Sequence, residues 1–411
     1  MAAAGVDEAG CGRRNLFCDS KQELPRRLMT RGAPLQVCFI LSSRGNVFGG
    51  LETIADNLAS GLARLGHEVT LLAGTHLTRS RRNDFPPGVE PIYVPSISHT
   101  SALLRSAARV AHCSPLNLQS LTFFLSCLSH RDARRRLVRA SVAVTFLEGE
   151  AMLFSRYLAR RSVGSIYYFS GGIDAGWASR DRSTLRVAIS QVIADRYERE
   201  HGYLCQAVVT PGIASEILVA PLAAERRESG PRRLLYVGRL EHLKQVDRLL
   251  PVVSALVRES PGLTLRIVGD GPARLSLKRQ VREDGLDGHV VFCGSQPHAE
   301  VLAELRQADV LLFPSVTESF GIVALEALAA GVPVVASDLP ALREATGGNA
   351  ALLPSNDLAA WIDATRRLIS NDELRRTCAV RGRAWAEKFT WDKIVDKFEG
   401  LLYETASATG R

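Results

Sequence analysis

The sequence predicts an α/β protein made of two Rossmann-like domains, each with a doubly wound parallel sheet. Short apolar segments alternate along the chain with longer segments whose apolar residues recur at helical spacing, which is the pattern of strand–helix–strand units. Many of the apolar segments end at a glycine or another turn residue. The 411 residues are enough for two domains of about 180 residues each, and a domain of that size can bury its own core.

The amino-terminal half is expected to form the first domain, at residues 33–215. Its first strand is predicted at Leu35–Leu41 and its first helix at Leu51–Leu65, because Ile54, Leu58 and Leu62 share one helical face. The later elements expected are strands at Val142–Leu147, Ser165–Phe169 and Ala207–Thr210, with helical stretches at Glu150–Arg161 and Ser183–Glu200. Residues 1–32 are rich in alanine, glycine and charge, and we expect a disordered tail there.

The carboxyl-terminal half is expected to form the second domain, at residues 216–388, after a polar linker at Ala224–Pro231. Its predicted strands are Leu234–Val237, Leu265–Val268, Val290–Cys293 and Val310–Phe313, and a helix is predicted from Gly321 to Ala330, ended by Gly331. The last segment, 389–411, is expected to be a helix that crosses back to the first domain.

The segment Val316–Glu326 is the most informative one for function. It joins a strand, through a turn, to the start of an apolar helix. Free N–H groups in the first turn of a helix bind anions, so the backbone of residues 320–323 is expected to hold a diphosphate. Glu318 is placed to accept from sugar hydroxyls, and Glu326, about two turns along the helix, from a diol such as ribose. The alternative is that Glu318 complements the helix dipole and Glu326 is a solvated helix residue.

Two cations flank a second junction between a strand and a helix. Arg239 comes soon after the strand Leu234–Val237, and Lys244 precedes the next helix. Open α/β sheets bind ligands at such junctions, and a guanidinium with an ammonium there would neutralise a diphosphate and hold it as a leaving group. The turn Gly269–Gly271 lacks the third glycine of a dinucleotide fingerprint, so we interpret it as a turn and not as an NAD site.

With these features the chain resembles the family 4 glycosyltransferases, which are retaining enzymes of the two-domain GT-B fold that use nucleotide-diphosphate sugars. The resemblance covers Leu35 to about Tyr403. Its motifs are the Glu318 to Glu326 spacing with Phe320–Gly321, Gly238–Arg239 with Lys244, Gly269–Pro272, and Gly331–Ser337. Four motifs in the order that the family has them make a chance match improbable.

The resemblance implies that Arg239 and Lys244 contact the diphosphate, Glu326 the ribose and Glu318 the donor sugar. It also implies that Gly49–Gly50 approaches the donor phosphates from the first domain, although this pair is otherwise interpretable as a flexible turn. The expected catalytic residues are Arg239, Lys244 and Glu318. The expected donor-binding residues are Gly49, Gly50, Gly238, Arg239, Lys244, Gly269, Gly294, Glu318, Ser319, Phe320, Gly321, Ile322, Val323 and Glu326.

The chain departs from the family pattern at three places. Family members often carry a histidine after a central strand of the first domain, whereas here Tyr167–Phe169 is followed by Ser170–Gly172. Gln245 stands where a glycine commonly follows the basic residue, and Pro211–Ile213 reads Pro-Gly-Ile where Pro-Asn-Gly is usual. We therefore assign none of the nine histidines to catalysis.

Composition limits the partners. The net charge of +8 is modest and the cations are not interleaved with aromatics, so we expect no nucleic acid. The densest basic run, Arg131–Arg139, follows the apolar Leu121–Leu128; it is interpreted either as a solvated helix face or as a surface for anionic lipid or an acidic acceptor. The eight cysteines show no metal spacing, and together with the absence of a secretion signal or membrane span they predict a cytoplasmic protein, with peripheral contact at the inner membrane face as an option.

The sequence and the resemblance therefore predict a retaining glycosyltransferase that moves a sugar from a nucleoside-diphosphate sugar to a hydroxyl acceptor on a small molecule, glycan or lipid. A UDP-sugar is the first choice of donor and a GDP-sugar the second. No Asp-x-Asp motif is placed to bridge a diphosphate, so we expect no metal and no cofactor besides the nucleotide sugar. A nucleotide-sugar 2-epimerase of the same fold and an inactive donor-binding partner subunit are the alternatives. The acceptor is expected to meet loops such as His76–Gly88 and His99–Ser120, which match no pattern that we can interpret.

Overall fold

The computed structural model describes residues 32–42, 50–75, 85–97, 101, 106, 115–171, 183–202, 204–223 and 230–410. Residues 34–411 form one compact unit, and the description below concerns that unit. The tail expected at residues 1–32 lies, apart from Gly32, outside the described residues, as do Gly49 and most of the linker and loop segments discussed above.

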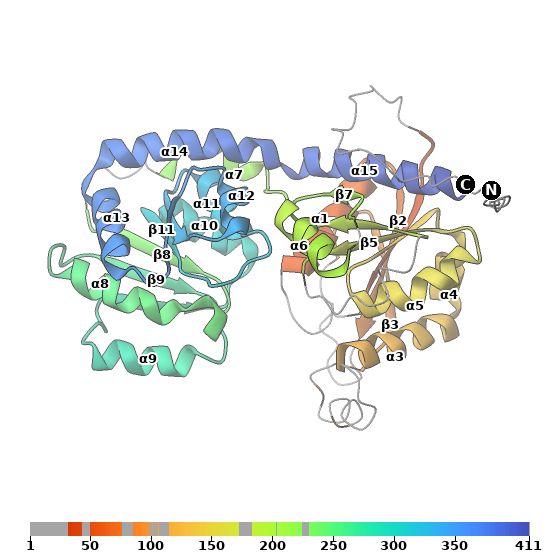
Figure 1. The fold of residues 1–411 in the computed structure, drawn as a ribbon, viewed down its shortest axis with the longest axis horizontal. Helices are drawn as coiled ribbons and strands as arrows, with labels where there is room; N and C mark the ends of the chain where they lie inside the picture. Colours follow the sequence, from red (N-terminus) through yellow and green to blue (C-terminus); the bar gives the residue numbers. More distant parts are fainter. Residues whose placement is uncertain are drawn as a thin grey trace, which may run out of the picture. The chain divides into compact units, whose positions relative to one another are not determined.

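The first sheet belongs to the amino-terminal half and has seven parallel strands in the order β3-β2-β1-β4-β5-β6-β7 (Figure 1). The strands are β1 Gln36–Leu41, β2 Glu68–Thr75, β3 Val89–Pro95, β4 Val142–Thr145, β5 Gly164–Phe169, β6 Thr184–Ala188 and β7 Ala207–Val208. The helices beside it are α1 Gly50–Arg64, α3 Pro115–Ser129, α4 Arg131–Arg139, α5 Glu148–Ala159 and α6 Gln191–His201. Two separate apolar clusters cover the two faces of this sheet, as a doubly wound domain requires.

The second sheet has six parallel strands in the order β10-β9-β8-β11-β12-β13. Its strands are β8 Arg233–Val237, β9 Thr264–Val268, β10 Val290–Gly294, β11 Val310–Phe313, β12 Val334–Ser337 and β13 Ala351–Leu353. Its helices are α7 Glu216–Val219, α8 Leu249–Val257, α9 Arg274–Glu283, α10 His298–Gln307, α11 Ile322–Ala330, α12 Pro340–Thr346, α13 Leu358–Ser370 and α14 Asp372–Ala386. Two apolar clusters again cover its two faces. The predicted fold class, two doubly wound parallel-sheet domains, is confirmed.

The last helix, α15 Trp391–Ala408, contributes to the core of the first sheet although it follows the second sheet in the chain. It packs against α1 and β5 and buries Phe398 and Leu402 completely. His67, at the turn before β2, joins this contact, because its Nε2 lies 2.9 Å from Glu399 Oε1 and its Nδ1 accepts from the Leu35 N–H at 3.0 Å. The end of the chain therefore closes the first domain.

One predicted element is wrong. The single helical stretch expected at Ser183–Glu200 is a strand, β6, followed by the helix α6. Strand β6 is buried at all five positions and pairs with β5. These tertiary contacts make the segment a strand, although the charged Arg186 obscures the strand pattern in the sequence. Ser190 then begins α6, since its side chain accepts from the Ile193 N–H. The strand β3 was not predicted from the sequence either.

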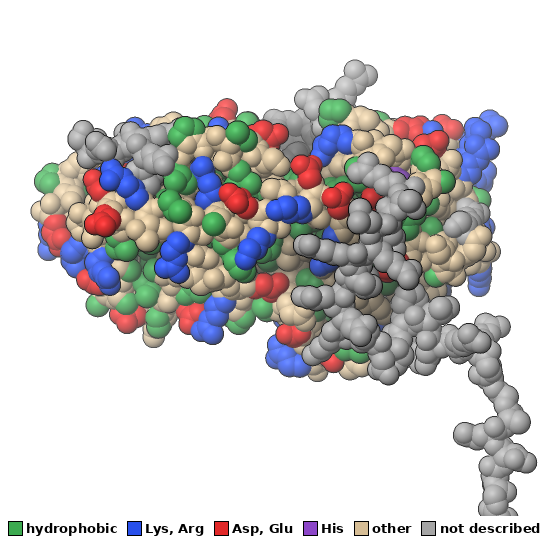
Figure 2. All heavy atoms as spheres, turned by 90° about the horizontal axis from the view of Figure 1, so that it is seen from above, with side chains coloured by type: hydrophobic (Ala, Val, Ile, Leu, Met, Phe, Trp, Pro, Cys, Tyr) green, Lys and Arg blue, Asp and Glu red, His purple; other side chains and the backbone are tan. Residues whose placement is uncertain are grey.

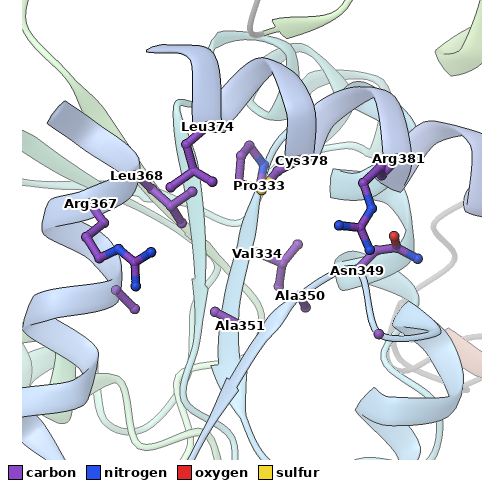
Figure 3. Close-up of a pocket in the computed structure, with 12 residues that line it drawn as sticks. Pro333, Val334, Asn349, Ala350, Ala351, Arg367, Leu368, Leu374, Cys378 and Arg381 are labelled. Carbon is purple, nitrogen blue, oxygen red and sulfur yellow. The ribbon is translucent and has the colours of Figure 1, made fainter. Parts of the chain in front are cut away.

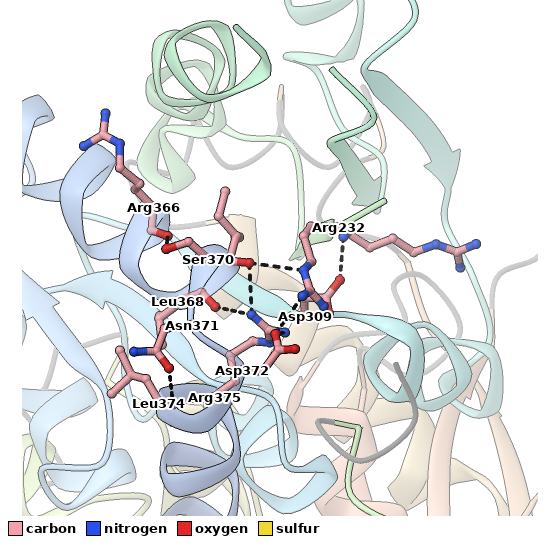
Figure 4. Close-up of polar contacts among 11 residues, drawn as sticks. Arg232, Asp309, Arg366, Leu368, Ser370, Asn371, Asp372, Leu374 and Arg375 are labelled. Atoms are coloured by element: carbon pink, nitrogen blue, oxygen red, sulfur yellow. Dashed lines mark hydrogen bonds and ion pairs between the residues drawn. The ribbon is translucent and has the colours of Figure 1, made fainter. Parts of the chain in front are cut away.

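A polar network ties the start of β8 to α14 (Figure 4). The Arg232 guanidinium contacts Asp309 at 3.5 Å and Asp372 at 2.7 Å, and Arg375 pairs with the same Asp372. Asp309 also accepts from the Arg233 N–H at 2.7 Å. Because Asp309 and Arg375 are almost fully buried, each charge depends on these partners, and the network fixes the amino-terminal edge of the second sheet.

Charges of both signs are interspersed on the face that carries α14 (Figure 2). A surface of this kind has no single-sign field of the sort that attracts nucleic acid. Among the described residues, no helix is both long enough and apolar enough to cross a membrane.

Candidate active site

The predicted donor residues of the second domain follow the carboxyl ends of its strands. Gly238 follows β8, Gly269 follows β9 and Gly294 ends β10. The Gly269 N–H donates to the Gly294 carbonyl at 2.7 Å. Gly269 has a φ of 138°, and a Cβ added there would lie 1.9 Å from the Gly238 carbonyl oxygen, so no side chain fits. The three loops therefore meet at backbone distance, at the edge where open parallel sheets bind ligands.

The loop after β8 is tied directly to the loop after β11. The Val316 N–H donates to the Leu243 carbonyl at 3.0 Å. Just beyond, Gln245 has φ 45° and ψ 44°, the left-handed conformation that normally favours glycine. This is the position where the resembled family commonly has glycine, and Gln245 adopts a conformation that glycine takes without strain.

Lys244 and Glu318 come together across these loops. Lys244 Nζ lies 2.5 Å from Glu318 Oε1, and the exposed fractions of the two side chains are 21% and 11%. A pair that is this close and largely shielded from water is much stronger than an exposed one. The arrangement places a cation and a carboxylate, both predicted from the sequence, at one point of the site.

Helix α11 begins beside this pair. Gly321 is its N-cap, with φ 100° and ψ 52°, and a Cβ at Gly321 would lie 2.5 Å from Leu342 Cδ2. The left-handed backbone conformation therefore favours glycine, and a side chain here would also displace Leu342. Phe320 is 1% exposed and anchors the segment in the core. The first amides of α11 have no partners inside the helix and are available to an anion.

Glu326 lies on α11 and has a partner that the sequence did not reveal. Its Oε1 is 2.6 Å from His298 Nε2 at the start of α10. The hydrogen bond with this carboxylate raises the pKa of His298 above its ordinary value, and burial opposes the shift. The Glu326 side chain is only 7% exposed, whereas His298 is 46% exposed. No local spacing links two residues on different helices, so only the fold could identify His298.

Arg239 occupies a different position from Lys244. Its guanidinium is 63% exposed and contacts Glu241 Oε1 at 3.1 Å. Its carbonyl accepts from the Tyr236 hydroxyl at 3.0 Å, which holds the backbone of the loop. The structure thus brings Lys244, Glu318 and the start of α11 together and leaves the Arg239 side chain on the solvent side.

The first domain contacts the segment at the start of α11. A Cβ added to Gly50, the first residue of α1, would lie 3.8 Å from Ile322 Cδ1. The Ser190 hydroxyl donates to the Ser319 carbonyl at 2.7 Å. Of the predicted Gly49–Gly50 pair, Gly50 is therefore beside α11, while Gly49 lies outside the described residues.

Glu150 is a buried carboxyl at the carboxyl ends of β1 and β4. Its Oε1 accepts from the Ser42 N–H at 2.6 Å and its Oε2 from the Leu147 N–H at 3.3 Å. Burial raises the pKa of Glu150 to about 7, although these hydrogen bonds act in the opposite direction. Gln119 completes the cluster, because its side-chain amide donates to the Ser42 carbonyl at 3.1 Å. The cluster fixes the chain where it leaves β1.

One known protein family matches the part of the chain that carries this geometry. Residues 222–385 match the family described as glycosyl transferases group 1. The matched residues lie within the second domain. That domain contains the second sheet and the predicted donor residues that lie on it. A curated relative, the glycogen synthase of Mycobacterium tuberculosis, is 28% identical over 383 residues, which is 85% of this chain and 89% of the relative. The protein is therefore a glycosyltransferase, as the sequence predicted.

Solved structures share the whole fold of this glycosyltransferase. A sucrose-phosphate synthase from Thermosynechococcus elongatus has a TM-score of 0.70 at 20% identity, covering 91% of this chain and 99% of that one. HepE from Anabaena, solved in complex with UDP and glucose, has a TM-score of 0.67 at 17% identity, covering 90% and 99%. The predicted GT-B architecture is confirmed by these similarities.

The glycosyltransferase domain also has a cavity of about 240 Å³ at the opposite edge of the second sheet (Figure 3). Pro333 and Ala350 line it just before β12 and β13 begin, and Arg367 and Arg381 reach it from α13 and α14. Because all six strands are parallel, this edge is the far one from Lys244 and Glu318. The cavity is therefore separate from the predicted donor site. Within the described ranges, no three histidine, cysteine, aspartate or glutamate side chains gather as a metal site would need.

Proposed function

We propose that this glycosyltransferase is a retaining enzyme of family 4 that transfers a sugar from a UDP-sugar to a hydroxyl acceptor, with a GDP-sugar as the second donor to test. The observation that carries the proposal is the ion pair of Lys244 with Glu318, 2.5 Å apart at the start of α11. This pair and the start of α11 together supply the three chemical groups that bind a nucleotide sugar, namely a cation, a carboxylate and free helix amides. The UDP and glucose bound by HepE, which shares the fold, support the choice of nucleotide.

When the donor binds, Lys244 and Glu318 are proposed to separate, and each then pairs with a different part of the donor. Its diphosphate takes the Lys244 ammonium together with the first-turn amides of α11. Glu318 then loses its cation and accepts hydrogen bonds from hydroxyls of the donor sugar. The two residues are thus complementary to the two halves of one ligand.

Glu326 is proposed to hold the ribose. It lies on the same helix, and its carboxylate is 7% exposed, so a diol that reaches it is shielded from water. His298 fixes one carboxylate oxygen at 2.6 Å and leaves the second for the sugar. The nucleotide is then held by α11 along its length, with the diphosphate at the first turn and the ribose further along.

Transfer is proposed to proceed with retention and without a metal. The acceptor oxygen attacks the anomeric carbon from the face that the diphosphate leaves, the bond from that carbon to the phosphate oxygen breaks, and the departing phosphate oxygen takes the acceptor proton. Lys244, Arg239 and the α11 amides stabilise the charge that develops on the diphosphate. Glu318 positions the donor sugar and is not a nucleophile, since a glycosidase pair needs two acids that flank the scissile bond.

A donor panel tests the proposal. UDP-, GDP- and ADP-sugars are compared by thermal unfolding, and a ligand at 100 times its dissociation constant stabilises the fold by about 2.7 kcal/mol. Products of the stabilising donor are then analysed with a labelled sugar. Sugar transfer, or slow donor hydrolysis, supports the proposal. A changed sugar on the intact nucleotide indicates an epimerase, stabilisation without turnover indicates an inactive partner subunit, and no stabilisation by any donor overturns it.

A further inference from the structure

The corner between β6 and α6 of the first domain touches the second domain through three hydrogen bonds. The Ser190 hydroxyl donates to the Ser319 carbonyl at 2.7 Å. The Glu344 carboxylate accepts from the N–H groups of Gln191 at 2.8 Å and Val192 at 3.1 Å. Residues 190–192 are thus held by two segments of the second domain, the loop that precedes α11 and the helix α12.

The Ser190 hydroxyl serves both domains at once. As an acceptor it caps α6 through the Ile193 N–H at 3.2 Å, and its single proton is used on the Ser319 carbonyl. The side chain is fully buried, so no water competes for either bond. A hydroxyl is the smallest group that can accept from its own helix and donate to another segment.

The bond to Ser319 also orients the next amide. In a planar trans peptide the carbonyl and the N–H point in opposite directions, so fixing the Ser319 carbonyl fixes the Phe320 N–H. Phe320 is 1% exposed and Gly321 caps α11, which leaves this peptide little other freedom. The carbonyl points at Ser190, and the Phe320 N–H points away from Ser190. This amide is one of those proposed to bind the donor diphosphate.

Glu344 supplies a second, electrostatic link. A carboxylate at the amino end of a helix is favoured by the helix dipole and by the free first-turn N–H groups. Here the helix belongs to one domain and the carboxylate to the other. The contact is partly exposed, so it is sensitive to salt, unlike the buried Ser190 bond.

We propose that Ser190 and Glu344 are positioning residues for the transfer step, which hold the two domains together with the Phe320 amide aimed at the departing diphosphate. The proposal rests on the proposed function, since it acts through the donor loop. Neither residue touches the donor in this scheme. Their loss is expected to lower kcat by about tenfold, because small displacements of a reacting group reduce rates strongly, and to leave the affinity for free UDP within about twofold.

Four variants separate positioning from simple stability. Ser190→Asp keeps an oxygen to cap α6 but has no proton for Ser319, and Ser190→Ala loses both bonds. Ser190→Thr keeps the hydroxyl and is expected to retain most of the rate. Glu344→Gln keeps the shape but removes the charge. Asp357→Ala is the matched control, because Asp357 caps α13 through the Ala360 N–H, a bond that lies wholly within the second domain.

The readouts are kcat, UDP affinity by calorimetry, and the radius of gyration in solution with saturating UDP. Ser190→Asp, Ser190→Ala and Glu344→Gln are expected to lower kcat, to bind UDP normally, and to stay more extended than the wild type, while the control behaves as wild type. Normal kcat in Ser190→Asp and in Glu344→Gln overturns the proposal. So does an equal loss in Ser190→Thr. If the wild type itself fails to bind UDP or to transfer, the proposed function fails instead.

Discussion

Lys244 and Glu318, 74 residues apart in the chain, form an ion pair of 2.5 Å beyond the carboxyl ends of the strands β8 and β11. Both side chains were expected to face a nucleotide sugar, and in the structure each is the partner of the other. A shielded charge that loses its partner is costly, so a ligand that enters here has to give each of the two groups a new partner. A nucleotide sugar does so, since its phosphates are anions and its hydroxyls donate hydrogen bonds.

Lys244→Ala and Arg239→Ala are each expected to lose most of the transfer activity. A charge-assisted hydrogen bond to a diphosphate is worth about 1.5–3 kcal/mol, and stabilisation of the leaving group adds to it. Their stabilities should differ, because Glu318 is 11% exposed and loses the cation that neutralises it in Lys244→Ala, whereas the Arg239 side chain is 63% exposed. Initial rates and thermal unfolding measure both effects, with the exposed Arg279→Gln as control. Near-normal turnover in both variants would remove the two cations from the site.

The substitutions Glu326→Gln and Glu318→Gln are expected to affect donor binding and transfer differently. Glu326→Gln should weaken the binding of free nucleoside diphosphate as well as of the nucleotide sugar, because the ribose meets a donor where it needs an acceptor, a mismatch of about 1–3 kcal/mol. Glu318→Gln should leave the affinity for nucleoside diphosphate almost intact and slow transfer. Calorimetric titration beside initial rates tests this. Equal losses of diphosphate affinity in both would contradict the assignment of Glu318 to the sugar.

Binding of nucleoside diphosphate is expected to depend on pH through His298. The contact with Glu326 raises the pKa of His298 above its ordinary value of 6.5 in the free protein. A ribose that draws on the same carboxylate weakens this contact, so binding releases a proton and affinity rises with pH between 6.5 and the raised pKa. In His298→Gln the rise in affinity with pH should be smaller than in the wild type, because only the terminal phosphate of the ligand, with a second pKa of about 6, still titrates near that range. A wild-type affinity that falls with rising pH in this range would contradict the prediction that the ribose weakens the contact between His298 and Glu326.

Activity is expected to survive an excess of EDTA with at most a modest loss. The positive potential for the diphosphate is assigned to Lys244, Arg239 and the amides of α11, none of which a chelator removes. The measurement compares initial rates before and after chelation and after the return of Mg²⁺ or Mn²⁺. Loss of activity that either ion alone restores would show that the metal-free mechanism is wrong.

Helix α4 is expected to bind anionic vesicles at low salt. Arg131, Arg134, Arg135 and Arg139 are exposed on it, whereas Arg136 pairs with Glu90. Near an anionic surface each exposed cation contributes about 1 kcal/mol, so co-sedimentation should fall steeply as salt rises. Replacing Arg134 and Arg135 by glutamine should weaken it, and Arg136→Gln is the matched control. Vesicle binding that is absent at low salt would leave α4 as a solvated helix face.

The sequence predicted four of the six strands of the second sheet, because their signals are local. An apolar stretch closed by glycine marks β8, β9 and β10, and an apolar stretch followed by a turn that begins at Pro314 marks β11. The structure has strands at all four places. The first domain was harder, since β6 contains Arg186 and is identified as a strand only by its pairing with β5. Propensity within a short window does not register a partner that lies elsewhere in the chain.

The sequence by itself determined the fold class and the positions of Lys244, Glu318 and Glu326, because spacing between a strand and a helix fixes which residues reach the ligand edge of a parallel sheet. Only the tertiary structure decided their partners. The pairing of Glu326 with His298, the exposure of Arg239, and the bond from Ser190 to Ser319 all join segments far apart in the chain or depend on how such segments pack. Such contacts form when packing brings the segments together, and hydrogen bonds depend on tenths of an ångström that no sequence period encodes.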